Sequence, residues 1–233
     1  MTGNPAVYWV VQVITDVPGD SDWLTERERQ VLEGLRYVKR RADWRLGRWT
    51  AKRAVRFLSM ARSGQTLEPT DIEIVAAPDG APEAYARGAR SNVVISISHS
   101  GGVGFCAATA EELPLGCDVE TVGTRSDRFV SDFFTASEAE TVMRASQEER
   151  ALLATRIWSA KESALKAMRT GLDRDTRSVE VVETAETEAD EWGRLRVDCQ
   201  TQGRGYFGWW RLADDRVFTI LSTSQPGLPL PVP

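Results

Sequence analysis

The 233-residue chain is poor in the residues that build metal and disulfide frameworks. His99 is the only histidine, so a histidine-rich zinc site, and zinc hydrolase chemistry with it, is not expected. The three cysteines are odd in number, far apart and without metal-ligand spacing: Cys106, Cys117 and Cys199. We therefore expect them to be reduced core residues of a cytoplasmic protein.

Long hydrophobic runs and an excess of positive charge are also lacking. The apolar residues 6–14 are too few to span a bilayer, and they have neither a basic flank nor a small-residue cleavage site. We expect them to form a buried strand, with no membrane association. The formal net charge of −5 disfavours general nucleic-acid affinity.

Local signals predict both helices and strands. A helix is predicted over residues 42–61, and Gly171 is expected to end the last helix of the chain. Capping-box pairs open three further helices: Thr25 with Glu28, Thr135 with Glu138, and Ser146 with Glu149. Strands are predicted at 93–98, 103–109, around Asp118, and at 178–182, 195–199, 207–212 and 217–222.

These elements predict an α+β protein made of two similar halves, each with a mainly antiparallel sheet packed on helices. We place the halves at residues 1–112 and 113–233, since the chain offers a natural join near residues 110–116. The acidic residues 183–191 are expected to form a solvated loop. The proline-rich tail after Ser224 is expected to be loose.

Residues 115–120 carry a pair of acids. Apolar and polar side chains alternate there, so a strand would place Asp118 and Glu120 on one face. Two neighbouring carboxylates repel each other unless a positive charge lies between them. Mg²⁺ suits such a pair because it takes carboxylate oxygens and keeps room for water and phosphate. A solvent-facing strand edge is the alternative explanation of this Asp-x-Glu pattern.

The helix that follows Ser146 supplies a third acid. Trp158, Glu162 and Lys166 recur at a spacing of four and so share one helix face. With Asp118 and Glu120, Glu162 would complete three carboxylates for one divalent cation, an arrangement typical of phosphoryl-type group transfer. The plain alternative is that Glu162 and Lys166 form an i,i+4 pair, which stabilises an exposed helix by roughly 0.2–0.5 kcal/mol.

His99 stands at the end of a predicted strand, directly before Ser100 and two glycines that let backbone approach a ligand closely. Together with the hydroxyls of Ser98 and Ser100, it could hold a diphosphate. The alternative is a histidine that caps a hairpin.

Positive charge gathers on the helix predicted over residues 42–61 and its approach. Five basic residues recur there at helical spacing: Arg41, Arg45, Arg48, Lys52 and Arg56. A stripe of one sign without acidic partners favours a visiting anion, such as a multiply phosphorylated small molecule or an acidic protein surface. A solvated helix face is the ordinary alternative.

Taken together, these segments resemble Sfp-type 4'-phosphopantetheinyl transferases over roughly residues 25–185. The basic helix lies where that family has its coenzyme A binding region. Four motifs occur in the family's order and spacing: Ile97-Ser98-His99-Ser100-Gly101, Gly116-Cys117-Asp118-Val119-Glu120, Phe133-Phe134-Thr135-Ala136-Ser137-Glu138 and Trp158-Ser159-Ala160-Lys161-Glu162-Ser163-Ala164-Leu165-Lys166.

The resemblance implies Mg²⁺-dependent transfer of the phosphopantetheine arm from coenzyme A to a serine of an acyl or peptidyl carrier protein, with release of 3',5'-ADP. It also implies a monomer, because the fused two-half length resembles the Sfp type. The chain departs from the family at one position: Ala81, between Gly80 and Pro82, replaces a lysine that is common there.

The implied roles fall into three groups. Asp118, Glu120 and Glu162 would bind Mg²⁺, with Glu162 also acting as the base that accepts the serine proton. Lys166 would neutralise the leaving phosphate, and His99 with Ser98 would hold the diphosphate. The remaining coenzyme A contacts would come from Arg45, Arg48, Lys52, Gly80, Pro82 and Lys161.

The implied partner is an acidic carrier protein, which basic patches would attract. Phe129, Phe133 and Phe134 could dock a partner helix, although aromatic residues at this spacing more often belong to a core. Two other functions are left open. One is a different Mg²⁺ phosphotransferase or nucleotide hydrolase, and the other is a coenzyme-binding or carrier-binding module without turnover.

Overall fold

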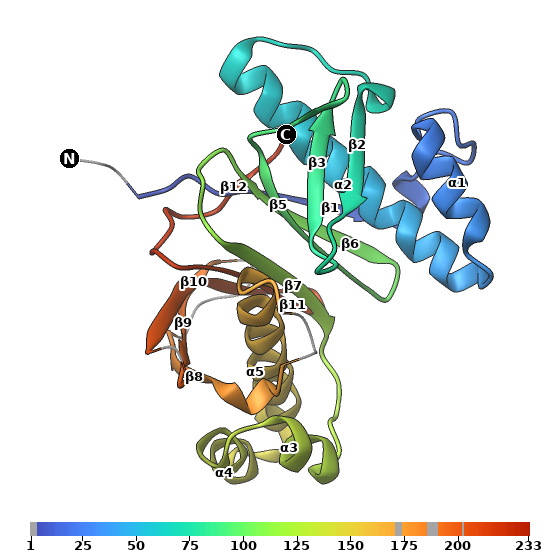
Figure 1. Cartoon of the computed structure of the whole chain (residues 1–233). Coiled ribbons are helices and arrows are strands. Elements are labelled where there is room, and N and C mark those ends of the chain that lie inside the picture. Colours follow the sequence, from blue (N-terminus) through green and yellow to red (C-terminus); the bar gives the residue numbers. More distant parts are fainter. Residues whose placement is uncertain (1–3, 171–173, 186–190, 202) are drawn as a thin grey trace. The chain divides into compact units, whose positions relative to one another are not determined.

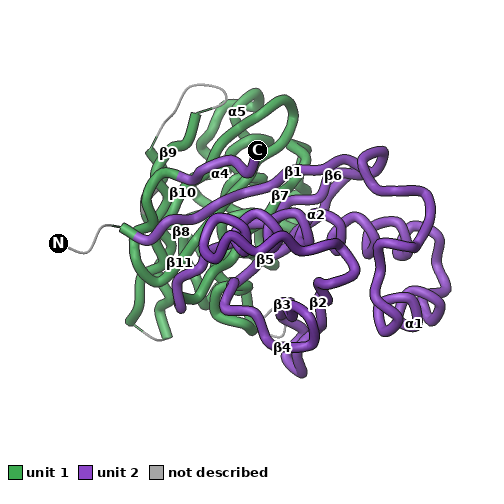
Figure 2. Tube along the Cα trace, turned by 90° about the horizontal axis from the view of Figure 1, so that it is seen from above, with its two compact units in different colours: residues 1–4, 113–228 green, residues 5–112, 229–233 purple. Residues whose placement is uncertain are grey.

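The computed structural model describes residues 4–170, 174–185, 191–201 and 203–233 (Figure 1). Within these residues, five α-helices and mainly antiparallel sheets form an α+β fold, which confirms the predicted class. The chain divides into two compact units. Unit 2 contains Pro5–Glu112 and Pro229–Pro233, and unit 1 contains Leu113–Leu228 (Figure 2).

Unit 2 combines two helices with two small sheets. One sheet has the strand order β12-β1-β6-β5 and the other has the order β2-β3-β4. Its elements are β1 (Tyr8–Val13), α1 (Glu26–Gly34), α2 (Val38–Ser63), β2 (Ile72–Ala76), β3 (Pro82–Ala86), β4 (Ala89–Arg90), β5 (Val94–Ser100), β6 (Val103–Thr109) and β12 (Leu230–Pro231).

Helix α2 packs against β1, β5 and β6 and closes the core of unit 2. Small and aliphatic residues of the helix, among them Ala51 and Val55, are fully buried there. The approach is tightest at Gly104 in β6, where a Cβ atom would come within 2.7 Å of the Thr50 hydroxyl oxygen. Any larger residue at position 104 would therefore push α2 away from the sheet.

Unit 1 contains one five-stranded sheet, entirely antiparallel, in the order β7-β11-β10-β9-β8. Its helices are α3 (Asp127–Phe133), α4 (Ala136–Arg144) and α5 (Gln147–Ala167). Its strands are β7 (Leu115–Thr121), β8 (Val179–Thr184), β9 (Gly193–Cys199), β10 (Arg204–Ala213) and β11 (Arg216–Ser222).

Helix α5 lies across the sheet of unit 1, next to β7 and β11 (Figure 1). Its buried stripe is made of small residues such as Ala160 and Ala164, so the helix backbone comes close to the strands. A Cβ atom at Gly116 of β7 would lie only 1.8 Å from the carbonyl oxygen of Ser163. Glycine is therefore required at position 116 for α5 to reach β7.

The three predicted capping boxes are present, at Thr25, Thr135 and Ser146. Helix α2 begins four residues earlier than predicted, at Val38, and ends at Ser63. Strands β2, β3 and β4 were not predicted, because they are short and β3 begins at a proline within a turn-rich segment.

The expectation of a loose C-terminal tail is wrong for its last residues. Leu230 and Pro231 pair with Tyr8 and Trp9 of β1, so the chain end adds a short parallel strand to a sheet of unit 2. In the acidic segment, Glu183 and Thr184 belong to β8 rather than to a loop. Gly171 and residues 186–190 lie outside the described residues.

Candidate active site

The acid pair of β7 lies on the strand face that α5 covers. Asp118 is buried, with 3% of its surface exposed, and Glu120 near the end of the strand is half-buried. Because alternate residues of a strand share a face, Asp118 and Glu120 lie on the same side as Gly116, where α5 comes closest. The alternative of a solvent-facing strand edge therefore does not hold for Asp118.

One face of α5 runs alongside these two acids. The indole nitrogen of Trp158 donates a hydrogen bond to Oε1 of Glu120 at 3.1 Å, and Nζ of Lys166 lies 2.8 Å from Oδ1 of Asp118. Glu162 lies one helical turn from each of these α5 residues, between the two contacts. The four-residue spacing along the helix thus places Glu162 and Lys166 next to the acids of β7, as predicted from the sequence.

Lys166 is tied to Asp118 and to the strand backbone. Besides its ion pair with Asp118, the ammonium donates to the carbonyl oxygen of Cys117 at 3.1 Å. Burial alone would lower the pKa of Lys166, but the negative charges of Asp118 and Glu162 outweigh it and raise the pKa overall. Lys166 is therefore a firmly protonated cation in the middle of this cluster.

Glu162 is the acid whose ionisation is most strongly opposed. Burial raises its pKa to about 7, Lys166 partly offsets the rise, and the charges of Asp118 and Glu120 add to it. Its Oε1 atom is buried, and no hydrogen-bond partner reaches it from the described part of the chain. A carboxylate with a pKa near 7 and an unused oxygen can both accept a proton and ligate a cation.

Whether these residues fit a divalent cation depends on the donors they offer. Three carboxylates within electrostatic reach of one another, one with an unused buried oxygen, match the oxygen-only preference of Mg²⁺. In the described ranges, however, no group of three or more His, Cys, Asp or Glu side chains is close enough to form a ready-made metal site. The donor chemistry fits the ion, and Lys166 and Arg125 provide the neutralising charge in this structure.

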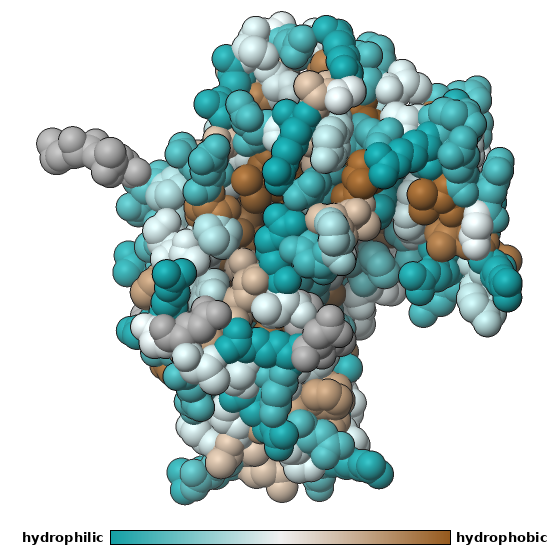
Figure 3. Space-filling view, in the orientation of Figure 1, coloured by the Kyte–Doolittle hydropathy of each residue, from teal (hydrophilic) through white to brown (hydrophobic). Residues whose placement is uncertain are grey.

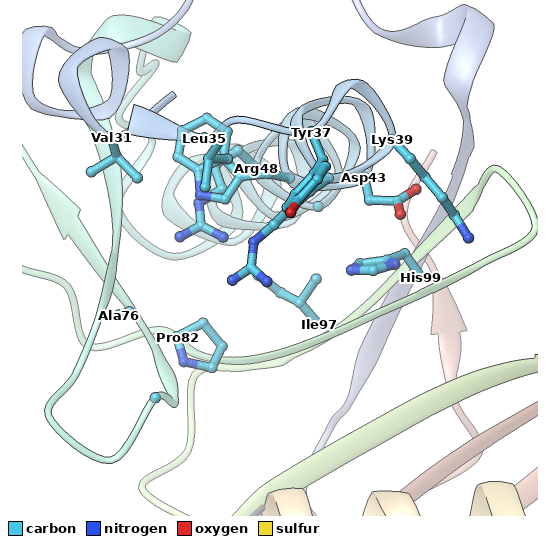
Figure 4. A pocket seen from close by; sticks show the side chains of 14 residues that line it. Val31, Leu35, Tyr37, Lys39, Asp43, Arg48, Ala76, Pro82, Ile97 and His99 are labelled. Atoms are coloured by element: carbon cyan, nitrogen blue, oxygen red, sulfur yellow. The ribbon is translucent and has the colours of Figure 1, made fainter. Parts of the chain in front are cut away.

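Unit 2 contains a cavity of about 800 Å³ beside α2. Figure 4 shows Arg48 and Tyr37 reaching it from the α2 side, Ile97 and His99 from β5, and Pro82 from the start of β3. Lys39, Arg40, Asp43, Trp44, Gly47 and Gly80 complete much of the wall. The structure thus brings together four residues singled out in the sequence: Arg48, Gly80, Pro82 and His99.

Arg48 is the cation of the basic stripe that faces this cavity. Its guanidinium carbon lies 4.5 Å from the centre of the Trp44 ring, and burial lowers its pKa. Its Nε atom is buried and lacks a hydrogen-bond partner among the described residues. A half-buried arginine with an unused donor in a cavity is suited to receive an anion.

The rest of the stripe is used inside the fold. Arg45 donates to the carbonyl oxygens of Pro18 and Asp20 and to the hydroxyl of Ser21. Arg41 and Arg56 likewise donate to backbone carbonyls. The stripe is therefore neither a solvated face nor a uniform anion site, because folded segments of unit 2 occupy most of its donors.

Lys52 does not reach the cavity at all. Its side chain is 1% exposed and its Nζ lies 2.5 Å from Oε2 of Glu28, whose side chain is 2% exposed. The ammonium also donates to the carbonyl oxygens of Trp23 and Pro69. The expectation that Lys52 receives a nucleotide is corrected by this geometry, since all three of its donors are used inside the protein.

Lys161 and Ser98 are likewise turned away from the positions we expected. Lys161 is fully buried and pairs with Glu138 at 2.7 Å, so it faces away from the acid cluster that its neighbour Glu162 joins. Ser98 is buried on the strand face opposite to Ile97 and His99, both of which line the cavity. Strand β5 therefore does not bring Ser98 to the cavity beside His99.

The sequence reading missed Arg125, which lies in the loop between β7 and α3. Its Nη2 is 3.3 Å from Oε2 of Glu120. Its only sequence signal was a basic residue five positions after Glu120.

The neighbouring phenylalanines form an aromatic cluster with Trp158: Phe134 is buried, Phe129 is half-buried and Phe133 is 36% exposed. Core packing thus accounts for most of this aromatic surface.

Residues 114–220 match the family model described as ACPS: 4'-phosphopantetheinyl transferase superfamily. The match starts one residue before β7 and ends within β11, so it contains Asp118, Glu120, Glu162 and Lys166. It does not extend to the cavity of unit 2. No curated protein matches the chain.

The chain is also similar to a solved structure, a holo-(acyl-carrier-protein) synthase from Bacillus anthracis str. Ames in complex with CoA (3',5'-ADP). The two share 23% sequence identity over 45% of this chain and 94% of that chain, with a TM-score of 0.36. We base the function proposed below on the residues of the site and on the family match.

Over the described ranges, none of the helices combines the length and the apolar character needed to cross a bilayer. The face of the molecule in Figure 3 is mostly hydrophilic, with smaller hydrophobic areas between the polar ones.

Proposed function

We propose that this protein is an Sfp-type 4'-phosphopantetheinyl transferase. It transfers the phosphopantetheine arm of coenzyme A to a serine hydroxyl of an apo acyl or peptidyl carrier protein and releases 3',5'-ADP. The observation that carries the proposal is the cluster of Asp118, Glu120, Glu162 and Lys166, which two elements of the family-matched segment build together.

In the proposed step, Oγ of the carrier serine bonds to the phosphorus next to the pantetheine arm. The bond from that phosphorus to the bridging oxygen of the diphosphate breaks, and 3',5'-ADP leaves. Glu162 accepts the serine proton, a role for which a pKa of about 7 is well matched. Lys166, firmly protonated beside Asp118, offsets the negative charge that gathers on the leaving phosphate.

Asp118, Glu120 and Glu162 are the residues that would hold Mg²⁺. When bound, Mg²⁺ would supply charge neutralisation for the phosphate oxygens. Burial and mutual repulsion raise the pKa of Glu120 and of Glu162 despite the nearby Arg125 and Lys166, so a further positive charge would be favoured in this cluster.

For coenzyme A we propose the cavity of unit 2. Arg48 offers a half-buried guanidinium with an unused donor, and His99 offers an exposed imidazole at the same cavity. Gly80 and Pro82 shape the wall near Ala81, where the family commonly has lysine. Lys39 and Arg40 line the cavity and are the basic residues that can compensate for that lysine. Arg45, Lys52, Ser98 and Lys161 are left out, because the fold uses or buries them.

The proposal further includes a monomeric cytoplasmic enzyme and an acidic carrier protein as the partner. Basic residues on the surface would speed the encounter with such a partner in a salt-sensitive way. The other two functions, a carrier-independent phosphotransferase or hydrolase and a binding module without turnover, are distinguished by the same experiment.

The test is incubation of the protein with Mg²⁺, coenzyme A and a panel of apo carrier proteins, followed by mass spectrometry of the intact carriers. We expect a mass gain of one phosphopantetheine arm on at least one carrier, and an equal amount of 3',5'-ADP. Consumption of coenzyme A with no change in any carrier would favour the hydrolase. Tight binding of coenzyme A without either product would favour the binding module.

A further inference from the structure

The carboxylate of Glu120 is held on both oxygens. Trp158 donates to Oε1 from helix α5, and Arg125 donates to Oε2 from the loop of residues 122–126. The two members of the ion pair are 24% and 25% exposed, so water reaches both. Each oxygen of Glu120 thus already accepts a hydrogen bond, and Arg125 also neutralises its charge, so a cation has to compete with Arg125 for this carboxylate.

The cluster contains three acids and two cations. Lys166 pairs with Asp118, and Arg125 pairs with Glu120. Oε1 of Glu162 is buried and has no hydrogen-bond partner in the described part of the chain. A divalent cation entering this cluster competes with a side chain that already neutralises one of its ligands.

Arg125 has a second contact besides Glu120. Its guanidinium carbon lies 5.1 Å from the centre of the Phe129 ring of α3, close enough for a cation–π contact. Its Nε atom is buried and has no hydrogen-bond partner among the described residues, so Glu120 does not saturate its donors. The guanidinium can thus remain over the Phe129 ring when Glu120 is taken.

The loop that carries Arg125 is anchored on the other side as well. The backbone N–H of Gly123 donates to the hydroxyl of Thr155 in α5 at 3.4 Å. Phe129 in turn packs on Trp158, with ring centres 5.0 Å apart. Through these contacts, a change in the position of Glu120 is transmitted to the loop, to α3 and to Trp158.

We propose that Arg125 is a built-in competitor for the divalent cation at Glu120. It neutralises Glu120 until the cation binds, and cation binding breaks the ion pair while the guanidinium stays over the Phe129 ring. This inference rests on the proposed function in one respect, namely that these acids receive a divalent cation. It adds a residue that sets cation affinity and that couples the cation site to the loop and to α3.

The experiment measures cation binding rather than transfer. Tb³⁺ luminescence, excited through Trp158, reports occupancy near Glu120, and displacement by Mg²⁺ gives the Mg²⁺ dissociation constant of the full chain. We expect Arg125→Gln to lower that constant about two- to fivefold, the range of one partly exposed ion pair. Arg125→Lys keeps the positive charge and should stay closer to the wild type.

Arg128→Gln is the matched control. It removes the same charge only three residues further along the chain, but Arg128 lies in α3, pairs with Asp132 and has a side chain that is 90% exposed. We expect it to leave the Mg²⁺ dissociation constant unchanged. An unchanged or larger constant in Arg125→Gln would overturn the proposal, as would an equal decrease in Arg128→Gln, which would reduce the effect to net charge.

A second measurement needs no variant, in case Arg125→Gln does not fold. In the wild-type protein, the side-chain Nε–Hε resonance of Arg125 should shift on Mg²⁺ titration with the same midpoint as the Tb³⁺ displacement. A resonance that stays in place at saturating Mg²⁺ would overturn the competition. If neither ion binds any form of the protein, the cation assignment itself is lost, whereas the carrier assay tests the transfer reaction independently.

Discussion

The two units of this protein share a buried ion pair of the same construction. In unit 2, Oε1 of Glu28 accepts from the backbone of Ile74, and Oε2 pairs with Lys52. In unit 1, Oε1 of Glu138 accepts from the backbone of Val181, and Oε2 pairs with Lys161. Both glutamates belong to capping boxes, so each pair ties a helix start to a long helix and to a strand.

The units differ at the positions next to this shared pair. Glu162 follows Lys161 and belongs to the acid cluster, whereas Arg53 follows Lys52. In the sheets, Glu120 pairs with the second residue of β11, and Gln12 pairs with the second residue of β6. In unit 2, Arg53 donates to Oε1 of Gln12 at 3.1 Å.

The same framework thus holds a self-satisfied hydrogen-bonded pair in one unit and two acids in the other. The pair of Gln12 and Arg53 needs no ligand, because each group has a partner in the protein. The pair of Glu120 and Glu162 has raised pKa values, since burial and repulsion act on both carboxyl groups. The framework is therefore common to both units, and the perturbed carboxyl groups of unit 1 belong to residues attached to it.

The largest expected effect is loss of turnover in Glu162→Gln. Removal of a general base lowers kcat by roughly 10²- to 10⁴-fold, so carrier modification should fall by this factor while the fold is retained. The measurement is the initial rate of carrier mass gain. Arg53→Gln, at the corresponding position of unit 2, is the control and should change kcat only slightly. Near-normal turnover of Glu162→Gln would remove Glu162 from the mechanism.

The next largest effect concerns the feature that the units share. Lys52→Met and Lys161→Met each leave a buried glutamate without its partner, and each should lower the free energy of unfolding by about 3–5 kcal/mol. Urea unfolding measures this. The double change Glu28→Gln with Lys52→Met should be milder than Lys52→Met alone. If only one of the two lysine variants has a lower free energy of unfolding, the buried ion pair does not stabilise both units.

A third effect is specific to Glu162: its raised pKa makes the free energy of unfolding depend on pH. Its pKa is about 7 in the folded protein, against an ordinary value of 4.5 for the unfolded chain. Between these values the folded state binds the extra proton, so stability falls as pH rises and the loss is complete above the folded pKa. With 1.36 kcal/mol for each pKa unit, the full loss is about 3 kcal/mol.

Glu162→Gln should therefore be more stable than the wild type at pH 8 and of similar stability at pH 4. Thermal or urea unfolding at the two pH values gives the difference. Equal stabilities at both values would contradict a raised pKa of Glu162.

The smallest effect is expected in the cavity of unit 2. Arg48→Ala should raise the KM for coenzyme A about tenfold, the effect of one charge-assisted hydrogen bond, with little change in kcat. This KM effect would contrast with the kcat effect of Glu162→Gln in unit 1. Arg53→Ala removes a cation that α2 does not present to the cavity, and serves as the control. An unchanged KM in Arg48→Ala would mean that the cavity does not receive the coenzyme.

Much of the acid cluster could be predicted from short-range patterns. Asp118 and Glu120 stand two residues apart in a strand, and Trp158, Glu162 and Lys166 stand four apart in a helix. Backbone geometry alone places each set on one face. That the two faces meet also has a sequence trace, since Gly116 and the small residues of α5 permit the close approach.

The basic stripe of α2 could not be resolved in the same way. Arg45, Arg48 and Lys52 repeat at helical spacing, yet one is bound to loop carbonyls, one faces the cavity and one is buried against Glu28. The spacing is the same for all three because it specifies a helix face and not what covers that face. Segments distant in sequence, including α1 and the loop before it, decide the environment of each cation.

The sequence by itself determined the helix starts, the strand alternation and the membership of each polar face, because caps and periodicity act over a few residues. Only the tertiary structure decided which charged groups are buried in pairs and which remain available. That choice depends on contacts such as Lys52 with Glu28 and Arg125 with Glu120, and on the burial that raises the pKa of Glu162. Burial and long-range pairing are properties of the packed chain, which no local pattern specifies.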